Sequence, residues 1–147
     1  MYKRQASFVG PLGTVPGFAR VITNCRDYTK LMQMLANGGI HNGEHILGRK
    51  TIDLIRTNTL TPTMIKEDFS NDYLAGYGYG YGMRTLMNRY EGQHNGMLGQ
   101  FGWTGGSGTW AECDPETGLS IVYMHNLQPN LEQYHHLRMR EVAYGCL

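Results

Sequence analysis

The stretch that decides the fold is Phe101-Gly102-Trp103-Thr104-Gly105-Gly106-Ser107-Gly108-Thr109. A strand that ends in Trp-Thr-Gly and continues with small residues places backbone N–H groups at the mouth of a cleft, where they can stabilise an oxyanion. Two other interpretations stay open. One is a plain glycine-rich hairpin turn. The other is a phosphate-binding loop, although no Lys follows the glycines and no strand–helix–strand context surrounds them.

Further strands and a helix are expected around this stretch. The residues predict strands over 98–103, 108–114 and 119–125. The last two are joined by Asp114-Pro115-Glu116-Thr117-Gly118, in which Pro fixes φ and Gly supplies a positive φ, so they should form an antiparallel hairpin. From about Asn130 the chain lacks helix breakers almost to its end, which predicts a C-terminal helix.

Upstream, glycine alternates with Tyr77, Tyr79, Tyr81 and Met83. A period of two predicts a strand over 76–83, with aromatic side chains on one face and bare backbone on the other. A glycine face in a strand often marks the close approach of another backbone or of a ligand.

Two helices are expected before these strands. Apolar residues recur at helical spacing between a Thr23 or Asn24 cap and the helix end at Asn37-Gly38-Gly39. These apolar residues are Tyr28, Leu31, Met32 and Leu35. A second helix is expected over about 49–57, and residues 58–75 are expected to form a loop.

The composition describes one ordinary domain of 147 residues without an extreme charge. It has 13 basic and 12 acidic residues, for a net charge of +1, whereas a nucleic-acid-binding protein usually has a basic excess or a basic stripe. No nucleic-acid partner is therefore expected. No apolar run approaches the roughly 20 residues that span a bilayer, so no membrane segment is expected. The first residues, MYKRQASF, contain no apolar signal-peptide core, and the compartment stays open.

Cysteine and histidine residues give little support for a metal or redox site. Cys25, Cys113 and Cys146 are widely spaced without a CxxC pair, and we expect three buried thiols. His41-x-x-Glu44-His45 has the inverted zinc-peptidase spacing, but the Asn-Gly pair inside it favours a surface turn. We therefore expect neither a metal nor a cofactor. The adjacent pair His135-His136 is expected to be solvated.

Taken together, these motifs resemble the C-terminal portion of the serine β-lactamase and penicillin-binding-protein superfamily, in its class C β-lactamase and esterase branch. The resemblance covers about residues 17–147, and the motifs follow the family's order. The matching segments are Asn24–Gly39 and Asn42–Leu47, Gly76–Gly80, Phe101–Thr109, and Asp114–Glu116 with the final Tyr144-x-x-Leu147.

The resemblance implies an α/β (α+β) fold, with an antiparallel sheet flanked by helices, as part of a β-lactamase/transpeptidase-like domain. It implies that the backbone N–H of Gly106 is an oxyanion donor and that Trp103, Thr104 and Gly105 bind substrate. Trp103 stands where β-lactamases and many penicillin-binding proteins have the Lys of Lys-Thr-Gly. It is similar to the Trp-x-Gly variant of the family's esterases, and it offers an apolar wall in place of a cation.

Two of the family's catalytic motifs are absent from the printed sequence. None of its serines begins a Ser-x-x-Lys motif, and Tyr123-Met124-His125-Asn126 does not have the spacing of Tyr-x-Asn. Residues 6–147 are accordingly expected to be the C-terminal part of a serine hydrolase domain that begins upstream of them. Residues 1–5 are expected to be a non-native scar, because Tyr2-Lys3-Arg4-Gln5 is what one reading frame of a common sequencing-library transposon end encodes.

The functional expectation is a fragment of a serine acyl-hydrolase that acts through an acyl-enzyme on an ester, β-lactam or peptide, and that is inactive as this chain. The alternative is a non-catalytic module that binds carbohydrate or peptidoglycan, or another protein, through Trp103, Trp110 and the tyrosines of 77–81. The strand at 119–125 is expected to be an exposed edge, because the family pairs it with an N-terminal strand. An unpaired edge favours self-association.

Overall fold

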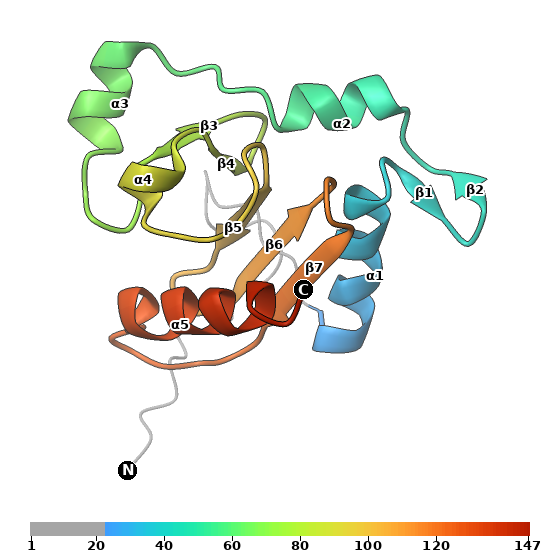
Figure 1. Cartoon of the computed structure of the whole chain (residues 1–147). Helices are drawn as coiled ribbons and strands as arrows, with labels where there is room; N and C mark the ends of the chain where they lie inside the picture. The colour runs from blue at the N-terminus through green and yellow to red at the C-terminus, as the bar shows by residue number, and fades with distance from the viewer. Residues whose placement is uncertain (1–22) are drawn as a thin grey trace, which may run out of the picture.

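A computed structural model of the chain describes residues 23–147 (Figure 1). Within them, five antiparallel strands form one sheet in the order β3-β4-β5-β6-β7, and two short strands form a separate hairpin. The sheet strands are β3 (Tyr77–Tyr79), β4 (Arg84–Leu86), β5 (Phe101–Thr104), β6 (Trp110–Asp114) and β7 (Leu119–Tyr123). This is the expected α/β (α+β) class. The expected scar at residues 1–5 lies outside the described residues.

Five helices accompany the strands in the part of the chain that the structure describes. They are α1 (Cys25–Ala36), α2 (Arg49–Ile55), α3 (Pro62–Asp68), α4 (Arg89–Gly92) and α5 (Glu132–Tyr144). Helix α1 begins where the sequence predicts, because the Asn24 side chain accepts a hydrogen bond from the Asp27 N–H at 3.0 Å. None of the described helices combines the length and apolar character needed to cross a membrane.

Helices α1 and α5 cover opposite faces of the sheet (Figure 1). On β6, Ala111 and Cys113 pack in the apolar core with Met32 of α1. The residue between them, Glu112, forms an ion pair with Arg140 of α5. Successive side chains of a strand point to opposite faces, so the alternation along β6 assigns one helix to each face. The α1 face is apolar, whereas the α5 face is charged and aromatic.

The α5 face holds a buried ion pair. Arg140 donates from Nε to Oε1 of Glu112 and from Nη2 to Oε2, both at 3.1 Å. The two side chains are 1% and 2% exposed. Nearby, the Tyr144 hydroxyl donates to Asp114 Oδ2 at 3.0 Å, so α5 is fastened to β6 by polar contacts at two points. Such contacts favour one register of the helix on the sheet.

The glycine-rich strand is shorter than predicted, and a hairpin turn ends it. Strand β3 stops at Tyr79, and the chain turns at Gly80–Met83 before β4. The predicted close approach is confirmed, because a Cβ at Gly80 would lie 2.1 Å from the Ile55 carbonyl oxygen. The Tyr81 N–H donates to the same carbonyl, and Gly82 has φ +81°. Contact with α2 therefore ends the strand.

Three other expectations about local structure were wrong. Residues 58–75 contain α3, which Thr61 caps and Pro62 begins. Strand β5 starts at Phe101 rather than at 98, because Gly99 has φ +84° and breaks the extended backbone. Strand β7 ends at Tyr123 rather than at 125. The hairpin between β6 and β7 is confirmed, with Asp114 Oδ1 accepting from two turn N–H groups and Gly118 at φ +73°.

Cysteine and histidine exposure also departs from expectation. Only Cys113 is buried, whereas Cys25 and Cys146 are exposed because they lie at the start of α1 and beyond α5. His136 is fully buried beneath α5, although we expected it to be solvated. The surface turn at His41–His45 is confirmed as the β1 (Ile40–His41) and β2 (Glu44–His45) hairpin.

Candidate functional site

The backbone of the β5–β6 connection is folded so that one amide points outward. The Gly105 N–H donates to the Thr109 carbonyl at 2.7 Å, and the Gly108 N–H donates to the Gly105 carbonyl at 2.9 Å. In a trans peptide the carbonyl and the next N–H point in opposite directions, so the Gly106 N–H is directed away from the loop interior. Among the described residues it has no acceptor, and a Cβ at Gly106 would meet nothing within 4 Å.

The segment before α5 holds this connection in place. The Gly106 carbonyl accepts hydrogen bonds from the side-chain amides of Gln128 and, at 3.5 Å, of Asn130. The Leu127 N–H donates to the Ser107 carbonyl at 3.0 Å. Because the carbonyls on either side of this turn are bound, the direction of the Gly106 N–H is fixed before any ligand arrives. A preorganised donor is what stabilisation of an oxyanion requires.

Trp103 forms an aromatic surface three residues before this amide. Its side chain is 40% exposed, and its ring lies edge-on to Tyr79 with the centroids 5.0 Å apart. Tyr79 in turn lies edge-on to Phe69, at 5.9 Å. Three aromatic rings from β5, β3 and the end of α3 thus make one continuous wall. The sequence pointed to Trp103 and Tyr79 but not to Phe69, because Phe69 is brought to the wall only by the packing of α3.

Thr104 lies at the end of β5, and Gly105 follows it. Thr104 Oγ1 is 3.1 Å from the Thr109 carbonyl and 3.3 Å from Glu132 Oε2. The structure therefore brings all four predicted site residues, Trp103 to Gly106, to one end of the sheet. It also adds Glu132, the first residue of α5, which no sequence motif indicated.

A relay of hydrogen bonds links the β5–β6 connection to the buried side chains between α5 and the sheet. His136 Nε2 lies 2.8 Å from the Gly108 carbonyl, which can only accept, so this nitrogen carries the proton. His136 Nδ1 therefore accepts from the Tyr73 hydroxyl, at 2.7 Å. The same hydroxyl accepts from Arg84 Nη2 at 3.0 Å. Sequence reasoning missed this relay because its residues are far apart in the chain.

Burial keeps the histidines of this face neutral. Desolvation lowers the pKa of His136 to about 4, against the opposing effect of its hydrogen bond to Gly108, and the positive charge of Arg84 lowers it further. Desolvation likewise lowers the pKa of His94 to about 3, with Arg140 and Arg84 adding to the effect. A neutral His136 is the form that the relay to Gly108 requires.

Stability should therefore fall on acidification. The unfolded chain protonates His136 near its ordinary pKa of 6.5, whereas the folded chain resists until about pH 4. Between these values the unfolded state binds more protons, so the free energy of unfolding decreases as the pH falls. One pKa unit is worth about 1.4 kcal/mol. Urea unfolding at several pH values in this window should show the decrease, and His136→Gln should reduce its slope, with the contribution of His94 remaining. Equal slopes in both proteins would contradict this assignment.

Two clefts in the described part of the chain lie near Asp53 and Arg56 of the α2 region, and neither includes residues 103–106. Residues 23–147 also contain no cluster of three His, Cys, Asp or Glu side chains that could hold a metal ion. The candidate site is thus an open end of the sheet, with an aromatic wall and a fixed amide.

Comparison with known proteins places this geometry in a family. The family model described as Beta-lactamase matches residues 1–144. A putative D-alanyl-D-alanine carboxypeptidase of Escherichia coli K12 is 28% identical over 118 residues, which are 78% of this chain and 24% of that protein. An uncharacterized protein of Mycobacterium tuberculosis is 28% identical over 109 residues, which are 71% of this chain and 27% of that protein.

Solved structures agree on the fold. The hydrolase EstCE1, which has promiscuous acyltransferase activity, superimposes with a TM-score of 0.66 at 22% identity over 83% of this chain and 30% of its own. A penicillin-binding-protein homologue from Caulobacter crescentus gives 0.60 at 26% identity, over 80% of this chain and 30% of its own.

The chain therefore spans about a quarter of the length of these curated relatives and about 30% of the solved ones. Because the family model matches nearly the whole sequence, the chain belongs to the β-lactamase family, and the proteins similar to it include a penicillin-binding-protein homologue.

Proposed function

We propose that this chain is the oxyanion-binding part of a serine acyl-hydrolase that works through an acyl-enzyme. The observation that carries the proposal is the Gly106 N–H, which points outward without an acceptor among the described residues. The carbonyl of its peptide is held by the Gly108 N–H, and the next carbonyl is held by Gln128 and Asn130. Backbone donors of this kind stabilise the negative oxygen of a tetrahedral intermediate. Trp103, three residues before the amide, would pack against the acyl group.

The covalent step belongs to residues that the printed sequence does not contain. An acyl-enzyme needs a nucleophile with an adjacent base. Without Ser-x-x-Lys and Tyr-x-Asn, the chain can bind an acyl group and polarise its carbonyl, but it cannot transfer that group. Oxyanion donors and binding alone leave only a residual rate.

The alternative of a sugar-binding aromatic platform has less support. Of the aromatic residues that it invokes, Trp110 is 1% exposed and Tyr77 is 3% exposed, so neither can stack on a ligand. The exposed residues that remain are Tyr81, at 61%, and Trp103, whose ring packs against Tyr79. Two of the aromatic side chains that the alternative needs are therefore unavailable for stacking.

We expect the chain to bind a neutral aryl amide without turning over acyl substrates. Titration with 3-phenylpropanamide should shift two NMR signals together: the Gly106 amide and the Trp103 indole N–H. The indole signal of buried Trp110 should stay in place and serves as an internal control. Nitrocefin and p-nitrophenyl esters should be hydrolysed only at the background rate.

Two results would count against the proposal. If saturating amide moves neither the Gly106 nor the Trp103 signal, the acyl site is not where we place it. If a fluorophosphonate probe labels any serine stoichiometrically, the chain contains a nucleophile and the assignment of the covalent step is wrong.

A further inference from the structure

We infer that Glu132 is a charge-selecting residue, which makes the acyl site reject substrates that carry a carboxylate next to the reacting carbonyl and accept neutral or ammonium-bearing ones. This inference rests on the proposed function, because it concerns the substrate class of the same site. It goes beyond the presence of an aromatic wall, since it assigns the discrimination to one carboxylate at the start of α5.

The polar groups beside the acyl site already bind this carboxylate. Glu132 Oε2 lies 3.3 Å from Thr104 Oγ1 and 3.3 Å from Asn130 Nδ2. Both contacts are part-buried, so they are less exposed to competing water than surface pairs. A carboxylate of this chain therefore already binds the Thr104 hydroxyl and the Asn130 amide, which are then not free to bind a substrate carboxylate.

The donors around Glu132 are used up within the chain. The Asn130 side-chain amide has two hydrogens, one for Glu132 and one for the Gly106 carbonyl. Thr104 has one hydroxyl hydrogen, which can go only to the Thr109 carbonyl or to Glu132. A bound anion would find no free donor on either side chain and would face an unneutralised negative charge.

The nearest buried cations cannot compensate. Arg140 is 1% exposed and forms both of its short bonds to Glu112. Arg84 is 0% exposed and is covered by the rings of Tyr73 and Tyr77, 4.4 and 4.7 Å from its guanidinium carbon.

The exposed aromatic wall favours the opposite charge. Among the described residues no cation lies over Trp103, so the exposed part of its indole is available to a ligand. An aromatic face attracts an ammonium group through its quadrupole. The indole of Trp103 and the carboxylate of Glu132 therefore each favour an acyl group that carries an amine over one that carries a carboxylate.

Glu132 also lies in the first turn of α5, where a negative charge stabilises a helix. That role would change stability on substitution but would not make ligand binding depend on ligand charge. The test is therefore a comparison of three ligands of one skeleton, rather than a measurement of stability.

The ligands are 3-phenylpropanamides that carry an aminomethyl, a methyl or a carboxylate group at carbon 2. At about pH 7.5 an aliphatic amine is charged, since the comparable lysine amine has a pKa of about 10.4. The Trp103 indole signal of the full chain reports binding. We expect the aminomethyl ligand to bind most tightly and the carboxylate ligand most weakly, with each step about two- to fivefold, the range of solvent-accessible charge pairs.

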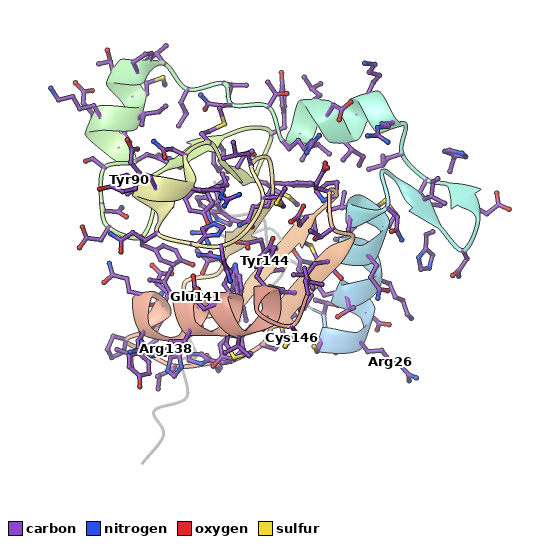
Figure 2. All side chains as sticks on the ribbon, in the orientation of Figure 1. Arg26, Tyr90, Arg138, Glu141, Tyr144 and Cys146 are labelled. Atoms are coloured by element: carbon purple, nitrogen blue, oxygen red, sulfur yellow. The ribbon has the colours of Figure 1, made fainter. Side chains whose placement is uncertain are left out.

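Glu132→Gln should make the three affinities equal to within about twofold. The matched control is Glu141→Gln, on the same helix nine residues further on, or about 13 Å along its axis, with an exposed side chain (Figure 2). In Glu141→Gln the aminomethyl ligand should still bind most tightly and the carboxylate ligand most weakly. As a second measurement, the three ligands should raise the thermal unfolding midpoint of the unsubstituted chain in the same order.

Equal affinities of the three ligands for the unsubstituted chain, or an order that persists in Glu132→Gln, would overturn the inference while leaving the acyl site in place. Binding of none of the three ligands would overturn the proposed function itself. The two failures are thus distinguishable.

Discussion

Glu112→Gln should destabilise the fold by about 3–5 kcal/mol, the usual result of removing one partner from a buried ion pair. The substitution keeps the size of the side chain and removes its charge. Arg140 would then keep its positive charge beneath α5 at 1% exposure with no anion bonded to it. Since a typical domain has only about 5–15 kcal/mol of stability, the variant should be largely unfolded at moderate urea concentrations.

Asp27→Asn is the matched control for this variant. It removes the same kind of charge from the pair between Lys30 and Asp27, whose side chains are both 55% exposed. Exposed pairs contribute little, so its urea midpoint should stay close to that of the unsubstituted chain. Similar midpoints for Glu112→Gln and Asp27→Asn would show that the buried pair does not hold α5 on the sheet.

The second large effect concerns association, because we expect the chain to self-associate through β7. In the sheet of the described residues β7 is an edge strand, and its sequence Leu119-Ser-Ile-Val-Tyr123 contains no charge and no proline. An edge strand without these features is a template for pairing with another chain. Sedimentation velocity should therefore show a mass that increases with concentration.

Ser120→Lys should shift the chain toward monomer at the same concentration. Ser120 is half-buried in the middle of β7, and a charge there opposes pairing of the edge with a second copy. Ser70→Lys adds the same charge at an exposed position after α3 and should leave association unchanged. A monodisperse monomer with a cooperative melt above about 60 °C would contradict this prediction. The edge strand β7 would then not mediate association, and the chain would be a self-sufficient domain.

Much of the local structure could be predicted from the sequence because short-range chemistry determines it. Asn24 caps α1 and the Asp114–Gly118 turn joins β6 to β7, each through residues within a few positions of one another. The site residues Trp103 to Gly106 could also be identified, since the motif that contains them is contiguous. Helix α3 was missed because its signal is only a threonine cap followed by Pro62, without an apolar period.

The tertiary structure alone decided which side chains act together. The sequence does not show that Gly80 abuts Ile55 and so ends β3, nor that Phe69 joins Trp103 through Tyr79. The sequence also does not show which histidine is buried, because His135 and His136 are identical in type and adjacent in the chain.

Residues 135 and 136 differ because α5 turns about 100° per residue and presents only His136 to the sheet, where it donates to the Gly108 carbonyl. Local sequence was enough to predict β5, the turn between β6 and β7, and the motif that contains the Gly106 amide. The charge that borders that amide depends on Glu132, which lies 28 residues from Thr104 and meets it only when α5 packs across the end of β5. Contacts at such separations follow from the packing of whole faces, which local propensity does not encode.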